Sequence, residues 1–576
     1  MSGDWSRSLA LVFLFHFPTW ASQLPAQTPS PAASEILATI KNLYQGEQWE
    51  AVLKLVPPSP DQIPELDYYR GMALARLQRW QEAREAFESG EKKSPTDKRF
   101  PLELAGISFQ TKSFSQAKAH LARALKLDGQ DSYAYEFLAS LYFLEGNLEA
   151  AIKYWNRIGK PKIQEIKMRP QPRLRAELLD RAFALAPASL LKLEDLRATQ
   201  TNLDLFGIYP RYRFELSPRQ DQKFDLMFYP VEKNGWGNSK LEGVFSVLKG
   251  VPYQTVYWDF FNLRQSALNF ESLLRWDAQK RRAFSSLSGA WRRNPKWRYR
   301  LHFDARKENW DLSRTYWGAI RPEGDLRIQE QSAGAEILAN LNPRWRWKSG
   351  FEWTHRQFRN VSLGITEKDQ LFPRGSSLKY KTGFDIKLVE IPERRFTAQS
   401  FATWELGRMF RAPYSTFTKV RGGVLTRWLP QSQGDDYAVT TQFRCGASHG
   451  PLPFDEFFIL GLERDNDLWM RGHIGTHNGK KGAGFLGRDY ILFNGELDKI
   501  VYQHAFFNIR LGPFLDSGRI FDEARRFGCR EWLWDVGAQV KVRVLGGATF
   551  IFSYGKDLRS GGNAFYTTIS SVVSLK

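Results

Sequence analysis

The 576 residues exceed what one ordinary core organises, so the length predicts two or three domains. The net charge of +20 admits nucleic acid, anionic lipid or an arginine-lined interior, but the basic residues alternate with aromatic ones instead of forming blocks, which disfavours a nucleic-acid tail. A mean hydropathy of −0.45, with no internal run of about 20 apolar residues, excludes a helical membrane protein.

The N-terminus has the outline of a secretory signal peptide. Arg7 precedes the apolar run from Leu9 to Phe17, and Thr19-Trp20-Ala21 offers a cleavage site, so residues 1–21 are predicted to be removed. Residues 22–34, rich in Pro, Ser, Gln and Ala, are predicted to form a flexible linker. Only two cysteines follow, Cys445 and Cys529, and in an exported protein they could pair or stay as separate thiols.

Residues 35–160 repeat with a period of 34. Ala83, Ala117 and Ala151 keep this step. So do three further sets: Gly71, Ala105 and Ala139; Phe87, Leu121 and Trp155; Trp80, Phe114 and Leu148. Small residues at fixed positions let paired helices approach closely. The segment resembles the tetratricopeptide repeat, which implies an all-α solenoid that binds a partner on its concave face; a rigid spacer or a dimer contact is the alternative.

Residues 161–235 change to a mixed pattern. A strand, two helices and two alternating strands are predicted in the order βααββ, with Gly207 ending the second helix and residues 218–221 forming the last turn. This order resembles a single POTRA domain. The resemblance implies a small α+β module with a sheet edge on which an incoming chain can add a strand; the alternative is a hinge.

Residues 236–576 alternate with a period of two. From Trp297 to Arg306 the odd positions are apolar and the even ones polar or charged, and residues 344–353 behave in the same way. Residues 534–544 also alternate, with the apolar residues at the even positions. Strands of about 10 residues with one apolar and one charged face are what a transmembrane antiparallel β-barrel requires. At roughly 20 residues per strand and connection, the segment has room for about 16 strands.

Two short motifs stand out among these strands. Trp469-Met470-Arg471-Gly472-His473 follows a Pro- and Phe-rich stretch, and Phe514-Leu515-Asp516-Ser517-Gly518 comes after it. Their order resembles the C-terminal half of the Omp85 superfamily (BamA/TamA-like bacterial surface antigens). The resemblance implies a loop that folds into the lumen with Arg471, Gly472 and His473 at its tip. His473 stands where that family usually has Phe or Tyr, and the chain does not end on an aromatic residue.

The alternation predicts the same contact. Between Phe507 and Gly518 the odd residues are apolar, so the even ones, among them Phe514, Asp516 and Gly518, would face the lumen. Arg471 is the natural partner of Asp516, because a guanidinium pairs bidentately with a carboxylate. The alternative is an extracellular loop, with Asp516 facing water.

The sequence offers no sign of an enzyme, a cofactor or a metal site. The histidines have no metal-ligand spacing with Cys, Asp or Glu, and Gly482-Ala483-Gly484-Phe485-Leu486-Gly487 lacks the strand and helix that a phosphate-binding loop requires.

Three functions are compatible with this organisation. The first is an Omp85-type factor in the outer membrane of a Gram-negative-type bacterium, with repeats and POTRA-like domain in the periplasm. These parts would recruit a protein partner or client, which the barrel inserts or exports; outer-membrane lipid and lipopolysaccharide would surround it, and nucleic acid is not expected. The alternative is an export pore for an acidic polysaccharide or a lipoprotein. An adhesive surface protein ranks last, since it would need long outer loops.

Overall fold

The computed structural model describes residues 31–58, 63–221, 223–233, 244, 250–313, 326–361, 371–411, 415–504, 507–522, 527–529, 531–544 and 548–571. The chain divides into two compact units, residues 1–134 and 135–576, and each is described by itself. The expected signal peptide and residues 22–30 of the expected linker lie outside the described residues. Helix α2 begins at Pro31, so the last residues of the expected linker are helical.

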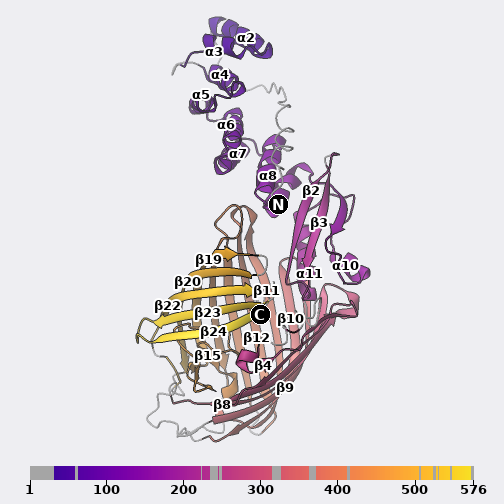
Figure 1. Ribbon diagram of the computed structural model, residues 1–576, viewed down its shortest axis with the longest axis vertical. Coiled ribbons are helices and arrows are strands. Elements are labelled where there is room, and N and C mark those ends of the chain that lie inside the picture. Colours follow the sequence, from indigo (N-terminus) through magenta and orange to yellow (C-terminus); the bar gives the residue numbers. More distant parts are fainter. Residues whose placement is uncertain are drawn as a thin grey trace. The chain divides into compact units, whose positions relative to one another are not determined.

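The first unit is a stack of antiparallel helix pairs (Figure 1). Its helices are α2 (Pro31–Gln45), α3 (Trp49–Leu55), α4 (Pro64–Arg76), α5 (Trp80–Lys93), α6 (Arg99–Gln110) and α7 (Phe114–Leu127). The small residues of the repeat lie where neighbouring helices touch. A Cβ added to Gly71 would stand 2.6 Å from the ring of Phe87, and one added to Gly90 would stand 2.2 Å from Phe100. Gly71 of the repeat, together with Gly90, therefore sets the spacing of these helices.

A polar cluster lies between α4 and α6 of this unit. The Tyr68 hydroxyl donates to Glu103 at 3.3 Å, and Arg99 pairs with Glu65 and with Asp97. Burial raises the pKa of Glu103 to about 7, although the hydrogen bond from Tyr68 and the nearby arginines oppose the shift.

The second unit opens with the last helix pair and a small α/β module. Helices α8 (Ser132–Leu144) and α9 (Leu148–Trp155) precede β1 (Ile163–Met168), α10 (Ala176–Ala182), α11 (Leu193–Phe206), β2 (Arg211–Pro218) and β3 (Phe224–Val231). The sheet order is β1-β3-β2, with β1 parallel and β2 antiparallel to β3. Gly207 adopts a left-handed conformation at φ 66° and ends α11.

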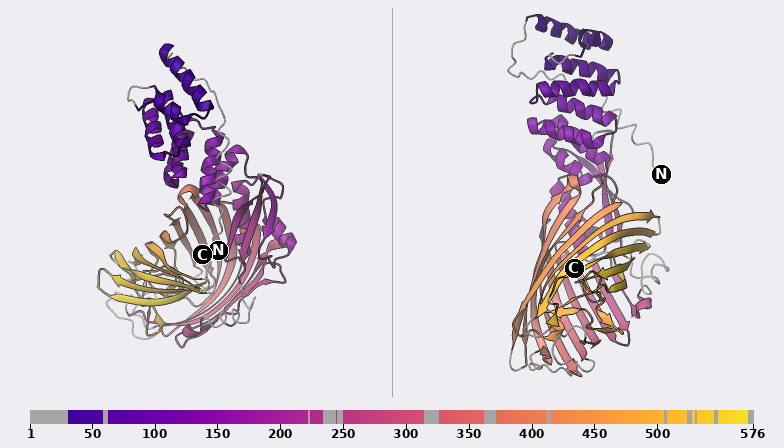
Figure 2. Two further views of the ribbon diagram at one scale, coloured as in Figure 1. Left: turned by 45° about the horizontal axis from the view of Figure 1, so that its top comes forward. Right: turned by 90° about the vertical axis from the view of Figure 1, so that its left-hand side faces the viewer.

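An antiparallel sheet wound into a barrel follows (Figures 1 and 2). Fourteen of its strands in the described residues have nine or more residues: β6 (Leu268–Trp276), β7 (Lys280–Ala290), β8 (Trp297–Trp310), β9 (Leu326–Asn342), β10 (Trp345–Arg359), β11 (Gly375–Ile391), β12 (Phe396–Met409), β13 (Thr416–Trp428), β14 (Tyr437–His449), β19 (Asp489–Gln503), β20 (Phe507–Asp522), β22 (Leu533–Val544), β23 (Ala548–Asp557) and β24 (Asn563–Ser571). The short β4 (Thr255–Val256) and β5 (Phe260–Leu263) pair with β6. The architecture is the predicted one, and the strand number is close to the 16 expected.

Exposure alternates along the barrel strands as the sequence predicts. On β8, Leu301 and Phe303 are exposed, whereas Arg298 and Asp304 are buried. The apolar side chains therefore form the outer face and the charged ones fill the interior, the reverse of a water-soluble barrel. Cys445 is exposed and Cys529 is buried, and both thiols are free.

One end of the barrel is attached to α11. Arg298 of β8 donates to the carbonyl oxygens of Leu205, at 2.6 Å, and of Phe206, while Asn340 of β9 donates to Thr201. These carbonyls belong to the last turns of α11, and a cation at this end also matches the helix dipole. No helix within the described ranges is both long and apolar enough to cross a membrane.

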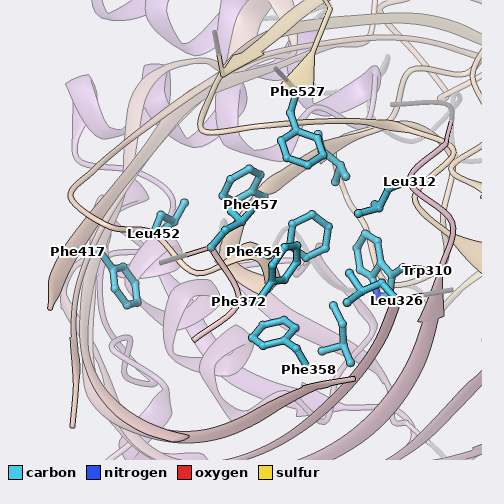
Figure 3. Packing of buried hydrophobic residues seen from close by; sticks show 13 residues of the cluster. Trp310, Leu312, Leu326, Phe358, Phe372, Phe417, Leu452, Phe454, Phe457 and Phe527 are labelled. Carbon is cyan, nitrogen blue, oxygen red and sulfur yellow. The ribbon is translucent and has the colours of Figure 1, made fainter. Parts of the chain in front are cut away.

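The opposite end of the interior holds an aromatic cluster (Figure 3). Trp310 contacts Phe454 edge to face with ring centroids 5.2 Å apart, and Phe372 lies 5.3 Å from Phe454. Trp310 is twelve residues along β8 from Arg298, about 40 Å at the rise of a strand. The interior between the two ends is therefore polar but has an apolar plug at one of them.

The raised pKa of Glu103 predicts that the repeats lose stability as pH rises. In the folded state Glu103 keeps its proton up to about pH 7, whereas in the unfolded chain it loses the proton near the ordinary pKa of a glutamate. The stabilisation from the protonated carboxyl is therefore fully present at low pH and is lost as the pH rises through 7. At pH 8, Glu103→Gln should therefore raise the unfolding free energy of the helices by about 1–2 kcal/mol, measured by helical circular dichroism, and have little effect at pH 4.5.

Glu88→Gln provides the matched control, because Glu88 is an exposed carboxylate on α5. Comparing each variant with the wild type at the same pH removes the contributions of other titrating groups. An equal gain for Glu103→Gln at both pH values would contradict the buried state of this carboxyl.

Candidate functional site

The chain between β14 and β19 enters the barrel interior. It contains the turn η5 (Phe454–Glu456) and the short strands β15 (Phe458–Leu460), β16 (Thr476–His477), β17 (Lys480–Lys481) and β18 (Phe485–Gly487). We call residues 461–484 the inward loop. Its stem is closed by two backbone hydrogen bonds, from Leu462 N to His473 O at 2.7 Å and from Gly475 N to Leu462 O at 2.8 Å. Residues 466–473 form the tip between them.

Three aspartates on neighbouring strands face the tip. Asp516 of β20 is the cross-strand partner of Asp535 of β22, and Asp535 is the partner of Asp557 of β23. All three side chains are buried, and Asp516 and Asp535 have no exposed surface. Adjacent carboxylates in a water-poor interior repel one another, so this aspartate row needs cations and donors.

Arg471 and Asp516 form a bidentate ion pair. Arg471 Nη2 lies 2.5 Å from Asp516 Oδ1, and Nε lies 2.8 Å from Oδ2. The backbone N–H of Arg471 also donates to Oδ2, at 2.9 Å. Both side chains are essentially inaccessible to solvent, so each charge depends on the other for compensation. The structure thus brings together the two residues that the sequence singled out.

The rest of the Arg471 guanidinium is also satisfied. Nη1 donates to Glu496 at 2.6 Å and to Gln539 at 3.0 Å, and the guanidinium stacks 3.9 Å above the ring of Phe514. Phe514 therefore faces inward and forms a cation–π contact with the tip. Asn494 completes the pocket by donating to Asp516 Oδ1 at 2.7 Å.

Gly472 and His473 cover the rest of the aspartate row. Gly472 N donates to Asp535 Oδ2 at 2.6 Å, and a Cβ on Gly472 would stand 2.6 Å from that carboxyl group. His473 lies between two carboxylates, with Nδ1 3.1 Å from Asp535 and Nε2 3.4 Å from Asp557. A protonated imidazole can donate from both nitrogens, which fits this position better than the neutral ring.

The same three side chains have the spacing of a metal site. The candidate ligand atoms of His473, Asp535 and Asp557 lie within 4.8 Å of one another. Sequence spacing gave no sign of this group, because its members come from the loop and two different strands. Both ring nitrogens already face carboxylate oxygens, so a proton and a metal ion would compete for the same positions.

Small residues make room for the tip. A Cβ on Gly555 of β23 would stand 2.1 Å from the carbonyl oxygen of Arg471, and one on Gly537 of β22 would stand 2.6 Å from Phe514. Gly518 lies nearer the stem, where an added Cβ would stand 3.4 Å from the sulfur of Met470. The tip is therefore fitted to the strands sterically as well as by charge.

A second acidic part of the loop was missed by the sequence reasoning. Asp465 accepts from Arg275 of β6 and Arg282 of β7, both at 2.7 Å, and Glu463 pairs with Lys280 at 3.1 Å. All of these side chains are at most 8% exposed, apart from that of Arg282 at 19%. The inward loop thus holds the first strands of the barrel through its acids and the last strands through Arg471.

A third group, just before the loop, was also missed. Asp455 and Glu456 pair with Arg356 at 2.9 and 3.3 Å, and Glu456 binds Lys379 at 2.6 Å and Lys419 at 3.1 Å. The sequence showed acids beside Phe454 but not the strands they would meet. These contacts fix β10, β11 and β13 to the segment that carries the aromatic cluster.

The Arg471–Asp516 pair predicts strong thermodynamic coupling. Arg471→Met leaves the buried Asp516 without its cation, and Asp516→Asn leaves Arg471 with Glu496 as its remaining carboxylate partner. Each variant should therefore lower the midpoint of heat-modifiability in detergent. The double variant should lose less than the sum, with a coupling free energy of about 2 kcal/mol or more. The control pair is Arg510 and Asp435, where Asp435 is half-exposed and coupling should stay below about 1 kcal/mol. Additive losses at the buried pair would contradict the contact.

His473 predicts a rescue experiment. Among the described residues, Asp535 has its one ion pair with His473, so His473→Phe should lower the same midpoint by leaving a buried carboxylate unpaired. Adding Asp535→Asn should recover part of that loss. If adding Asp535→Asn to His473→Phe did not raise the midpoint, the result would argue against the pairing of His473 with Asp535. A lower wild-type midpoint after chelator treatment would assign the three side chains to a bound cation.

Comparison with known proteins gives two kinds of match. Tetratricopeptide repeat models match residues 47–98 and 74–141. No curated protein matches the sequence significantly.

Three solved structures of other proteins align with 71% of this chain. BamA from Haemophilus ducreyi, lacking POTRA domains 1–3, aligns over 84% of its length at 11% identity and a TM-score of 0.42. CdiB from Escherichia coli aligns over 75% of its length at 13% identity and a TM-score of 0.44. CdiB from Acinetobacter baumannii aligns over 73% of its length at 10% identity and a TM-score of 0.41. The chain therefore carries tetratricopeptide repeats ahead of a β-barrel, and the inward loop of this barrel seats Arg471 on Asp516.

Proposed function

We propose that this chain is an Omp85-type outer-membrane factor that inserts or exports polypeptides. The observation that carries the proposal is the Arg471–Gly472–His473 tip seated on the aspartate row inside the barrel. It belongs to a barrel that directly follows a small α/β module with a free sheet edge. A loop bound at this depth organises the strands around it and occupies the space that an open pore would need.

The outer face of the barrel supports a membrane position. Exposed apolar side chains such as Leu301, Phe303 and Phe351 lie on its strands, while the exposed tryptophans include Trp297 and Trp345 near one end and Trp276 and Trp353 towards the other. A band of apolar residues flanked by aromatic ones is typical of barrels in outer membranes. The α/β module and the repeats would then lie in the periplasm, as the signal peptide would also require.

The α/β module provides a surface for an extended chain. β2 pairs with β3 along one edge, and its other edge has no strand partner among the described residues. The outer edge of β1 differs, because Ile163 N donates to Ser189 O at 2.8 Å and Lys162 bridges to Leu190. β2 is therefore the edge on which a client can add a strand, in the manner of β-augmentation.

The module is held close to the barrel strands that it would serve. Asn147 of α9 donates to Pro392 O at 2.7 Å, and Lys153 pairs with Glu393 in the same turn, between β11 and β12. Arg197 of α11 bridges Glu149 of α9 and Glu390 of β11. These contacts keep α9 and α11 at the end of the barrel where a client would arrive, while the preceding repeats would recruit a partner or the client itself.

The alternative export pore for an acidic polymer fits the interior less well. A conducting path for an acidic polymer requires unpaired cations along the wall. Instead, Arg282 pairs with Asp304, Lys379 with Glu352 and Lys481 with Glu308, each within 2.7 Å. These three interior cations neutralise carboxylates and are not available to an acidic polymer.

The proposal predicts client contacts at β2. A photo-crosslinking residue at Arg213, whose side chain is about two-thirds exposed on the edge strand, should form adducts with outer-membrane polypeptides in growing cells. The same residue at Asp180, exposed on α10 of the same module, should not. Adducts at both positions alike, or at neither, would contradict strand addition at β2.

A deletion separates recruitment from client handling. Removing residues 31–131 keeps all of α8 and α9, so the contacts of Asn147 and Lys153 with the barrel turn survive. Fewer Arg213 adducts with unchanged heat-modifiability would support recruitment by the repeats. An unchanged adduct yield would remove that role, and a steady open conductance in planar bilayers without adducts would favour the pore.

A further inference from the structure

The outer face of β7 to β10 carries a group of cations at the strand ends remote from α11. Arg281 of β7 is the cross-strand partner of Lys307 of β8, and one row further along Arg327 of β9 is the partner of Arg359 of β10. Lys307 has the same strand parity as the exposed Leu301 and Phe303, so this group of four faces outward. We call it the rim cluster.

Within the described residues, no carboxylate compensates the rim cluster. None of its four side chains forms an ion pair there, in contrast to the interior Arg282, which pairs with Asp304 and Asp465. Arg327 donates to Asn309 at 3.1 Å, which leaves its charge unbalanced. The neighbours in the row of Arg281 and Lys307 are the neutral Gln329 and Gln357. Adjacent cations on neighbouring strands repel one another, which favours an anionic ligand.

A hollow of about 580 Å³ is lined by Arg281 and Lys307 but not by Arg327 or Arg359. Its floor includes Ala283 and Ala305, which are cross-strand partners and one pair further from the rim than Arg281 and Lys307. Leu274 and Trp276 line one side of the hollow, and His355 lies on the other. The alanines leave space on a face otherwise covered by large side chains, so the cations border a recess and not a flat surface.

The height of the rim cluster matches a membrane boundary. Ten residues of β8 separate Lys307 from the exposed Trp297 at the opposite end, about 33 Å along the strand and about 25 Å along the barrel axis at a typical tilt. This height equals that of the apolar band of an outer-membrane barrel. The rim cluster therefore lies where lipid headgroups begin.

The breadth of the rim cluster indicates the kind of headgroup. From Arg281 on β7 to Arg359 on β10 there are three strand spacings, about 14 Å, which is wider than one phosphodiester spans. Glutamine side chains lie between the cations, and their amides both donate to and accept from hydroxyl groups. Phosphates separated by sugar rings match this order of cations and amides.

We propose that the rim cluster and its hollow bind a phosphorylated glycolipid of the outer leaflet. Arg281 and Lys307 hold one phosphate and Arg327 and Arg359 another, by charge-assisted hydrogen bonds. The sugar rings lie between the two phosphates, over Gln329 and Gln357, and the acyl chains run down over Ala283 and Ala305 along the apolar rows below. The inference rests on the proposed function only in taking the strand ends remote from α11 to face the outer leaflet.

The test measures binding of labelled diphosphoryl lipid A to the purified full chain in detergent. Arg281→Gln combined with Lys307→Gln should weaken binding at least about 10-fold, since each lost charged contact is worth about 1.5 kcal/mol or more. The control combines Arg292→Gln with Lys296→Gln, which removes the same charge from the exposed turn at the other end of β7 and β8. Heat-modifiability of each variant confirms that the barrel is folded.

Two competitors identify the ligand class. Unlabelled diphosphoryl lipid A should displace the probe, whereas dephosphorylated lipid A should not. Equal displacement by phosphatidylglycerol would overturn the glycolipid assignment, as would unchanged binding in the rim variant or an equal loss in the control. Intact lipid A binding without Arg213 adducts would overturn the proposed function alone, and the reverse result would overturn this site alone.

Discussion

The structure depends on an electrostatic constraint inside the barrel. Asp516, Asp535 and Asp557 stand side by side on three adjacent strands, buried and without water to separate their charges. Such a row is unstable unless something supplies positive charge and N–H donors at close range. The tip of the inward loop supplies both, in three consecutive residues. The aspartate row is therefore stable only with the loop tip in place, and the charges of the tip are balanced only by the aspartates.

The same loop joins parts of the barrel that are far apart in sequence. Its tip binds β20, β22 and β23, while Asp465 and Glu463 bind β6 and β7. A barrel sheet is held between neighbouring strands by backbone hydrogen bonds, but nothing in those bonds links its first strands to its last across the interior. Side-chain charge provides that link here, and a client that opened the barrel would have to work against it.

Charged side chains are arranged differently inside the barrel and on its outer rim. Inside the barrel many cations lie against carboxylates, among them Arg282, Lys379 and Lys481. On the outer rim of β7 to β10 the cations have no such partners among the described residues. In the proposed membrane orientation these rim cations face lipid headgroups, while charges inside the barrel hold the loop.

The sequence by itself determined the elements and their faces. The 34-residue period reflects helix contacts that recur at glycine and alanine, the βααββ order fixed the module before the barrel, and strand alternation placed Asp516 on the inner face opposite Arg471. These features are local, since periodicity follows from helix and strand geometry. Only the tertiary structure decided which inward residues share a row. The position of a residue along its strand determines which face of the sheet it lies on, but not its height in the barrel or its neighbours on other strands. The register between strands decides those. Only the structure could therefore reveal the Asp516–Asp535–Asp557 row, the partners of Asp465 and the rim cluster.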